Sequence, residues 1–407
     1  MFGSWLRWAA KAEDRVEYRY EDYRESEGRI HIRTHGLFFE QELNSKITAR
    51  GNLIYDGISG ATPTGEPAGV GQKDIPTAEI RDIRRAGSLD LGVRWGRFTT
   101  TPQISYSEES DYISRGFAVN QSIDLNQRNT TLTLGLARNY DSVSGGSLRG
   151  YRSKETTDLL IGFNQVLGPK TVLTANLTLG YSDGYLSDPY KRATFLLSDS
   201  PDPIFSDPAS VNPVGDTRPG HRFRQVGYLS LTQFVTPANA SVELSYRLGH
   251  DDWDVWASTV SLTWFQKIGK YVVLAPLFRF HHQSAASFYG PSFYGVSFED
   301  YVNGTRAAFQ DGVFVGFEGD ESFPKPNEQG AYSILNVPAR PKYFSADYRL
   351  SELNAFTYGI SAQVKLKDHV TLDLGFKRYE MHGLDGITPK SAYPIANVFT
   401  IGCGWWF

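Results

Sequence analysis

Ionisable side chains of both signs recur at every second position in several stretches of this sequence. Glu17, Arg19 and Glu21 alternate with tyrosines, and Glu243 and Arg247 alternate with apolar residues. Charges cannot be left against hydrocarbon, so the face that carries them must meet water or an opposite charge. We expect these rows to line a water-filled interior, with the following residues as its lining: Arg19, Arg50, Asp90, Arg94, Asp124, Glu243, Arg247, Arg279, Lys365, Asp373 and Lys377.

Histidines are the next residues that could do chemistry, and there are eight of them. His281 follows Arg279 on a candidate inward row with Ser284 nearby, and a serine–histidine pair is the nucleus of many hydrolases. The sequence contains no G-x-S-x-G, H-E-x-x-H or C-x-x-C-H pattern. We therefore expect no catalytic residues, with a membrane-embedded hydrolase as the weakest alternative.

Acidic residues between 187 and 220 could offer oxygen ligands to Ca²⁺. They are Asp188, Asp199, Asp202, Asp207 and Asp216, and their spacing is irregular. An acidic solvated surface is the simpler interpretation, so we expect neither a metal site nor a cofactor. The single cysteine, Cys403, excludes an internal disulfide framework, and the net charge of −4 argues against a nucleic-acid partner.

A period of two dominates the chain from about residue 14 onward. In 171–181, Leu173, Ala175, Leu177, Leu179 and Tyr181 fall on one face and polar residues on the other. Aromatic residues make up 14 % of the chain, yet no stretch has the ~18 consecutive apolar residues of a membrane-spanning helix. An antiparallel membrane barrel explains both facts.

Turn signals divide 14–407 into 16 expected strands, although 14 to 18 would fit. They are 14–24, 28–42, 46–57, 80–96, 101–111, 115–126, 129–143, 154–167, 170–186, 221–236, 240–251, 254–267, 270–286, 341–366, 369–383 and 392–407. Strand 28–42 changes phase between Ile32 and Leu37, which suggests a bulge. The stretch 341–366 exceeds one span, so we expect part of it to rise above the membrane as a hairpin arm.

Short turns alternate with long connections, which is typical of barrels with tight periplasmic turns and long extracellular loops. The connection 287–340 is rich in aromatic residues, so we expect it to constrict the pore, cap its mouth or bind a partner. Residues 1–13 carry an apolar stripe at helical spacing and form a separate amphipathic segment. We interpret it as a periplasmic plug or cap, as a frayed leader, or as a helix lying at the membrane interface. No signal peptide is recognisable, and we expect one to have been removed.

The last strand carries Gly402, Trp405 and Phe407. This arrangement resembles the C-terminal assembly signal of outer-membrane proteins, which the barrel-assembly machinery recognises. The resemblance implies a location in the bacterial outer membrane, in contact with its lipids and lipopolysaccharide.

Further motifs resemble an uncharacterised, DUF3570-like family of Gram-negative outer-membrane β-barrels with porin-like architecture. They are Glu17–Tyr23, Gly28–Ile30, Tyr55–Pro63, which reads YDGISGATP, and Tyr106–Tyr112. The family has no assigned activity, so the resemblance implies a fold and leaves the function open.

The expected function is an outer-membrane pore for small hydrophilic solutes, because a wide barrel with charged inner rows can hold an aqueous channel. The alternative is a barrel without a channel that anchors or sheathes a partner, such as a redox protein. A homo-oligomer or a periplasmic partner fits either hypothesis.

Overall fold

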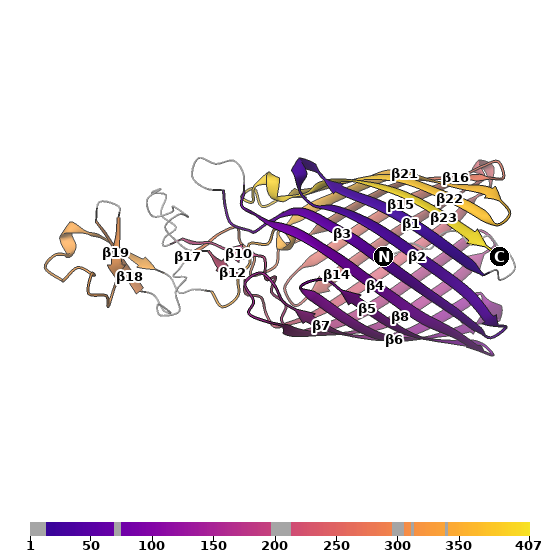
Figure 1. Cartoon of the computed structure of the whole chain (residues 1–407), viewed down its shortest axis with the longest axis horizontal. Coiled ribbons are helices and arrows are strands. Elements are labelled where there is room, and N and C mark those ends of the chain that lie inside the picture. Colours follow the sequence, from indigo (N-terminus) through magenta and orange to yellow (C-terminus); the bar gives the residue numbers. More distant parts are fainter. Residues whose placement is uncertain (1–13, 69–74, 197–212, 295–304, 311–312, 338–340) are drawn as a thin grey trace.

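The computed structural model describes the chain except residues 1–13, 69–74, 197–212, 295–304, 311–312 and 338–340. Its main body is a closed antiparallel barrel in which each strand pairs with the strands before and after it along the wall (Figure 1). The expected all-β class and the number of 16 strands are confirmed. The predicted N-terminal segment, 1–13, lies outside the described residues.

The barrel strands run in the order in which they occur in the sequence. They are β1 (Arg15–Glu25), β2 (His31–Asn44), β3 (Ile47–Pro63), β4 (Thr77–Trp95), β5 (Phe98–Glu108), β6 (Tyr112–Leu125), β7 (Thr130–Val143), β8 (Arg152–Gly168), β9 (Thr171–Gly184), β13 (His221–Val235), β14 (Ala240–Asp251), β15 (Trp256–Ile268), β16 (Val272–Gln283), β21 (Leu353–Lys367), β22 (Val370–Gly383) and β23 (Ile395–Trp406).

Short elements occupy the connections between these strands. Strands β10 (Arg192–Ala193), β11 (Phe195–Leu196), β12 (Val214–Gly215) and β17 (Phe293–Tyr294) lie near the mouth, while β18 (Thr305–Gln310), β19 (Val313–Phe317) and β20 (Ser333–Val337) form a separate three-stranded sheet. Single 3₁₀ turns are η1 (Ser26–Gly28), η2 (Asn126–Arg128), η4 (Thr236–Ala238), η5 (Gln329–Ala331), η6 (Tyr348–Leu350) and η7 (Lys390–Ala392). Among the described residues, no helix has both the length and the apolar character needed to cross a bilayer.

The first and last strands close the wall. β1 pairs with β23 in an unbroken register from Arg15 opposite Trp406 to Glu25 opposite Ala396. Closure gives the edge groups of both strands hydrogen-bond partners, which a strand surrounded by lipid requires. β1 starts beside the residue at which β23 ends, and both of these strand ends lie at the end of the barrel that has the short turns.

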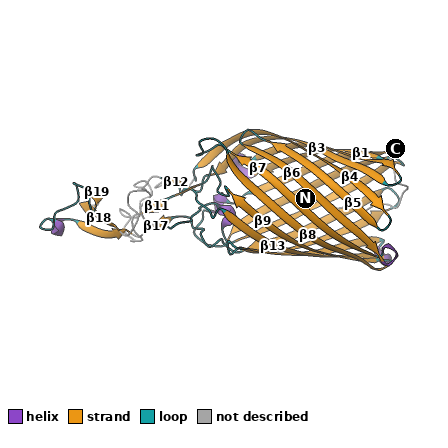
Figure 2. Cartoon of the chain, turned by 90° about the horizontal axis from the view of Figure 1, so that it is seen from below, coloured by secondary structure: helices purple, strands orange, loops and turns teal. Residues whose placement is uncertain are grey.

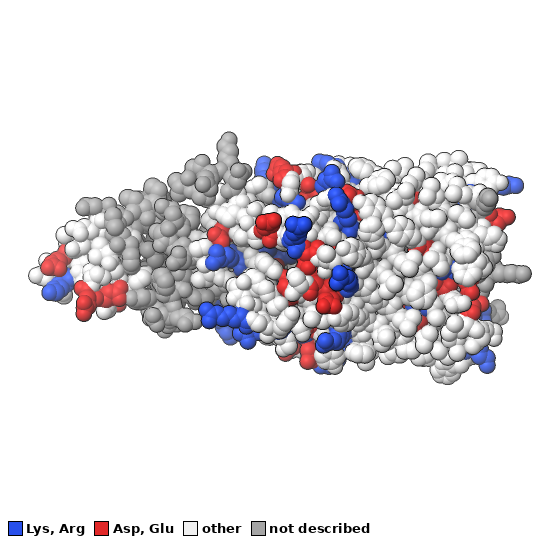
Figure 3. Space-filling model, viewed as in Figure 1, with Lys and Arg blue, Asp and Glu red and all other residues white. Residues whose placement is uncertain are grey.

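The outer face of the wall is apolar over much of its height. On β7, Leu134 and Leu136 point outward with 51 % and 53 % of their surface exposed, whereas Thr131 and Thr133 point inward. Figure 3 shows charged side chains gathered over the half of the barrel nearest the long loops and a largely uncharged stretch toward the opposite end. A sheet face of exposed leucine, isoleucine and aromatic side chains suits hydrocarbon, so this is a membrane-facing belt.

Two details of the expected strands are wrong. The alternation of β2 is not interrupted between Ile32 and Leu37; its register against β3 shifts only between Glu42 and Asn44. The apparent change of phase arises because the apolar residues Ile32 and Phe38 face the interior.

The second error concerns 341–366. The strand begins at Leu353, and 341–352 form loop and the turn η6 instead of a hairpin arm. Strands β3 and β4 extend further toward the long-loop end than expected, so their connection is only 64–76.

Candidate functional site

The inner face of the barrel is the first candidate site. Alternation along a strand sends successive side chains to opposite faces, so Tyr18, which is exposed on the outer face, fixes its neighbour Arg19 as inward. By the same alternation the expected lining residues all lie on the inner face: Arg19, Arg50, Asp90, Arg94, Asp124, Glu243, Arg247, Arg279, Lys365, Asp373 and Lys377.

A ladder of ion pairs runs across β1 to β4 on this face. Arg50 Nε lies 2.9 Å from Asp90 Oδ1, and Arg50 Nη1 lies 3.9 Å from Glu40 Oε2. Glu40 in turn is 3.9 Å from Arg15 Nε. These ion pairs thus join neighbouring strands along the wall and do not reach across the interior.

Charge is distributed unevenly around the inner face. On β1 to β6 the carboxylates Glu17, Glu21, Glu25, Glu40, Asp56, Asp82, Asp90 and Asp124 outnumber the cations Arg15, Arg19, Arg50, Arg84 and Arg94. On β13 to β22 the cations Arg222, Arg224, Arg247, Lys267, Arg279, Lys365 and Lys377 outnumber the carboxylates Glu243, Asp251 and Asp373. An acidic sector therefore faces a basic sector across the barrel.

The mouth at the long-loop end is the second candidate site, and one segment of the β9–β13 connection spans it. We call residues 187–193 the strap. Its Pro189 carbonyl accepts from Ser147 N at 3.0 Å, and its Arg192 N donates to Thr64 O at 2.8 Å. Gly146, in the left-handed region at φ 54°, permits the first contact, because a Cβ there would lie 2.1 Å from Pro189 O.

The strap also joins opposite sides of the ring. The Tyr190 hydroxyl donates to Asp111, between β5 and β6, and Arg349, between β16 and β21, pairs with Asp188. Eight strands separate these two connections in either direction around the barrel, β6 to β16 by one path and β21 to β5 by the other. A segment anchored at both places must cross the mouth.

A buried network of charges fixes the strap to the β16–β21 connection. Asp347 is 1 % exposed and accepts from Arg349 Nη2 at 2.6 Å and from Arg218 Nη2 at 2.9 Å. Arg218 also pairs with Asp216 at 2.6 Å. Burial by itself would raise the pKa of Asp347, but the surrounding cations outweigh it, and the pKa is held well below its usual value.

Lys191 lies at the centre of the strap and is 2 % exposed. Its Nζ donates to the Pro63 carbonyl and to Thr62 Oγ1, at 3.2 Å in the second case, and lies 5.6 Å from the Tyr348 ring centre. These partners are neutral, and burial lowers the pKa of Lys191 to about 8.

Apolar clusters complete the cover over the mouth. Trp253, Val255, Ala286, Phe288 and Leu350 form one buried group, and Tyr348, Leu353, Ala392 and Tyr393 form another. The loops at this end therefore pack on one another as a folded layer (Figure 2).

The long aromatic connection only partly behaves as expected. Its three-stranded sheet, β18 to β20, lies beyond the mouth, away from the barrel interior (Figure 1). The described residues past β17 do not fold into the pore, whereas Phe288 at the start of the connection packs with Trp253 and Leu350 over the mouth, as a cap would. The strap, 343–352 and Phe288 cover the mouth, and the alternating charges of Asp347 and Arg349 are the weak sign of this in the sequence.

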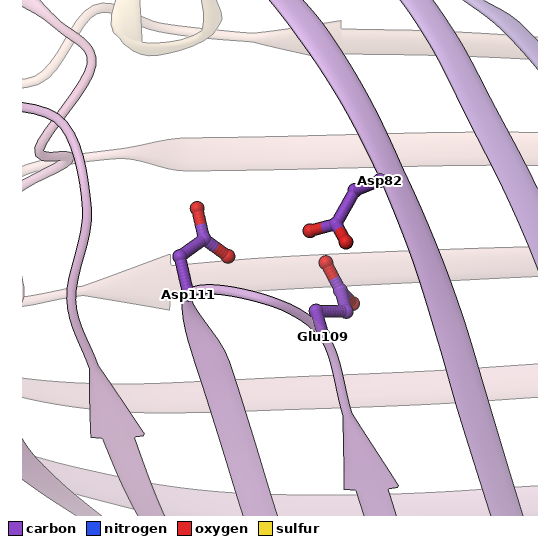
Figure 4. Close-up of side chains that lie close together, drawn as sticks. All are labelled: Asp82, Glu109 and Asp111. Carbon is purple, nitrogen blue, oxygen red and sulfur yellow. The ribbon is translucent and has the colours of Figure 1, made fainter.

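Three carboxylates approach one another at the rim of the acidic sector. Asp82 on β4 and Glu109 and Asp111 after β5 bring carboxylate oxygens within 4.8 Å (Figure 4). Burial, with Asp82 and Asp111 nearby, raises the pKa of Glu109. Such a group could hold a cation, but Ser110 and Tyr190 already donate to two of its members. Of the aspartates considered as Ca²⁺ ligands, Asp188 and Asp216 belong to the buried network, and the other three lie outside the described residues.

The expected assembly signal lies at the short-turn end. Trp405 and Phe407 project outward with ring centres 4.7 Å apart, and Gly402 lies on the inner face opposite Arg19. Phe407 N donates to Asp14 O at 2.9 Å, so the signal closes the barrel against the start of β1.

Comparison with known proteins identifies the family of the chain. Residues 5–389 match the family model described as "Protein of unknown function (DUF3570)", so the chain belongs to that family. No curated protein matches the chain.

Solved structures similar to the chain include three outer-membrane proteins. The siderophore receptor PirA from Pseudomonas aeruginosa is 10 % identical with a TM-score of 0.42; the match covers 96 % of this chain and 62 % of the receptor, so the chain spans about three fifths of that protein. A bacterial polysaccharide outer membrane secretin is 7 % identical, with 98 % and 99 % covered and a TM-score of 0.46. OmpT of Vibrio cholerae is 8 % identical, with 97 % of each chain covered and a TM-score of 0.40.

Proposed function

We propose that this DUF3570 protein is an outer-membrane pore for small hydrophilic solutes, with its external mouth gated by the strap. The observation that carries the proposal is the opposition of an acidic and a basic sector on the inner face. A wall that only anchored the chain in lipid would have no need of charged inner rows, because apolar side chains could fill it at lower desolvation cost.

The two sectors would act on a solute through its dipole. A field across the barrel orients a polar molecule and favours its entry over that of an apolar molecule of the same size. Because basic and acidic groups face each other, we expect weak selectivity between anions and cations and clear selectivity for polarity.

The strap supplies the gate. Its contacts at Asp188, Tyr190 and Lys191 are polar and ionic, so these side chains can be hydrated when the strap leaves the mouth. A closed mouth with rare openings is therefore the expected resting state.

Catalysis has little support. His281, the histidine considered for it, bonds to the Thr259 hydroxyl at 2.8 Å and lies 3.5 Å from the Gln283 amide oxygen, and neither partner is an acid. We propose that the protein is not an enzyme.

Planar-bilayer recording with the full chain tests the pore. We expect brief openings in the unmodified protein and longer ones in Arg349→Gln, which loses the link to Asp188. Arg149→Gln, an exposed position in the β7–β8 connection, is the matched control and should behave as the unmodified protein.

Selectivity tests the inner face. Lys377→Glu together with Arg279→Glu should shift the reversal potential toward cations. Arg115→Glu together with Arg138→Glu makes the same change of charge on the outer face and should not shift it. If none of these proteins conducts above leak while each remains a folded barrel, the pore is rejected in favour of a barrel that anchors a partner.

A further inference from the structure

The cations on the outer face of the wall are of one kind. Among the barrel residues whose side chains are described, every basic residue that faces outward by strand alternation is an arginine. These residues are Arg24, Arg33, Arg81, Arg85, Arg115, Arg138 and Arg378. They lie on β1, β2, β4, β6 and β7 and on β22, which only β23 separates from β1 around the ring. The lysines of the barrel strands whose side chains are described face inward, in contrast, and the other described lysines lie in turns and connections. Arginine is the cation that binds phosphate through two parallel hydrogen bonds.

Each of these arginines lies in the half of its strand that is nearest the long loops, and Figure 3 shows charged side chains gathered over that half of the barrel. On β1 to β3, aromatic rings lie between the apolar belt and the arginines. Tyr18, Tyr20 and Tyr55 surround His35, and the Tyr18 hydroxyl lies 2.8 Å from His35 Nδ1. Amphipathic rings mark the boundary between hydrocarbon and headgroups. The arginines beyond them therefore stand at headgroup height in the outer leaflet.

A hollow opens among the arginines at Gly57. Arg33 on β2 and Ile83 on β4 are its register partners, and Ser59, the next outward residue, lies between His31 and Arg81. A Cβ added at Gly57 would meet nothing within 4 Å. The hollow has a volume of about 490 Å³ and is lined by His31, Arg33, Tyr55, Gly57, Ser59 and Arg81 among others. It can seat part of a headgroup against the wall.

The guanidinium groups at the hollow retain capacity for a ligand. Arg33 has 62 % of its side chain exposed and reaches Asp22 only at 3.9 Å, beyond hydrogen-bond length. Arg24 lies 3.7 Å from the same carboxylate. Arg81 has no ion pair within 4.0 Å among the residues that the structure describes.

We propose that this outward hollow binds the phosphorylated headgroup of an outer-leaflet glycolipid, namely lipopolysaccharide. Arg33 and Arg81 hold a phosphate from two sides, and Tyr55 packs under the sugar ring to which the phosphate is attached. The neighbouring arginines along β4 to β7 extend the same surface to further lipid molecules. This inference stands on the outer face alone and does not depend on conduction through the barrel.

The experiment uses the full chain in detergent with lipid A carrying both phosphates as the probe, and native mass spectrometry to count bound lipid. We expect bound lipid A with the unmodified protein, a loss of at least one bound molecule in Arg33→Ala with Arg81→Ala, and the same loss in Gly57→Leu. The last variant fills the hollow while leaving the charge unchanged.

Controls separate this site from general attraction. Arg149→Ala removes one exposed loop arginine and should bind lipid A as the unmodified protein does. Dephosphorylated lipid A should not bind, and inorganic phosphate at equal phosphorus concentration should not displace the lipid. The proposal is overturned if the double variant, folded as judged by heat-modifiable migration, retains all its lipid, or if free phosphate competes as well as the lipid itself.

Discussion

Arg218 and Asp347 form an ion pair of 2.9 Å between two connections that are far apart in the sequence, the one before β13 and the one before β21. Both side chains are nearly buried, and Arg349 adds a second cation to the same carboxylate at 2.6 Å. Because Asp347 holds both arginines, its removal would leave two cations at the mouth without their shared partner.

Asp347→Asn should therefore loosen the mouth without unfolding the barrel. Breaking a buried pair by removing one partner costs about 3 to 5 kcal/mol, and the cost falls on the loops because the wall keeps its own hydrogen bonds. Limited proteolysis should cut 186–193 faster in this variant while heat-modifiable migration stays the same. Equal cleavage rates would show that the network does not hold the strap.

The same carboxylate predicts the acid sensitivity of the mouth. The folded pKa of Asp347 lies below its ordinary value, so its contribution is complete above that ordinary value, near 4, and is lost as pH falls toward the folded pKa. Closure should be constant near neutral pH and weaken in acid, and Asp347→Asn should remove that part of the acid sensitivity. Proteolysis with an acid-active protease measures it.

Lys191 predicts a second pH dependence, in base and of the same sign. Its folded pKa of about 8 lies below the value of about 10.4 for a free lysine, so the detached strap binds more protons between these two values. Closure should strengthen as pH rises from about 8 to about 10, by about 3 kcal/mol at most. In Lys191→Met the strap should show no such rise, and a rise of equal size in the variant would assign it to another group.

Gly359→Ala should disturb the wall itself. A Cβ there would lie 2.2 Å from Phe376 O and 2.7 Å from Lys377 Cα, both backbone atoms of β22. We expect a loss of about 2 kcal/mol, within the range for overpacked sites, measured by urea unfolding in lipid vesicles. Gly227→Ala on β13, where the nearest atom would lie 4.0 Å away, is the control and should cost less than half as much.

Phe407→Ala should separate assembly in the cell from stability in the test tube. The Phe407 side chain is exposed on the outer face, where its ring contacts only the neighbouring Trp405 ring among the aromatic contacts described, and its backbone bond to Asp14 is kept by alanine. If the terminal aromatic residue is a recognition signal, insertion into the outer membrane should fall sharply while refolding into detergent remains unchanged. A parallel loss in both would make Phe407 a structural residue only.

The wall could be predicted from the sequence because its information is local. Side chains alternate between two environments at every step, so segments such as 171–181 show their inner and outer faces without knowledge of their neighbours. Glu243 and Arg247 could be assigned to the inner face for the same reason. The phase of β2 was misjudged where Ile32 and Phe38 are apolar yet face inward, because the pattern shows polarity and not position.

The mouth could not be predicted because its contacts are not local. Lys191 pairs with Pro63 and Thr62, and Asp188 with Arg349, across more than a hundred residues of chain. No spacing in the sequence encodes such contacts; they arise only when the closed ring brings opposite connections together. The sequence by itself thus determined a barrel with charged inner rows and a terminal Phe407. Only the tertiary structure decided that the strap covers the mouth together with 343–352 and the start of the aromatic connection at Phe288, and that Gly57 opens a hollow between Arg33 and Arg81, since closure of the ring sets both.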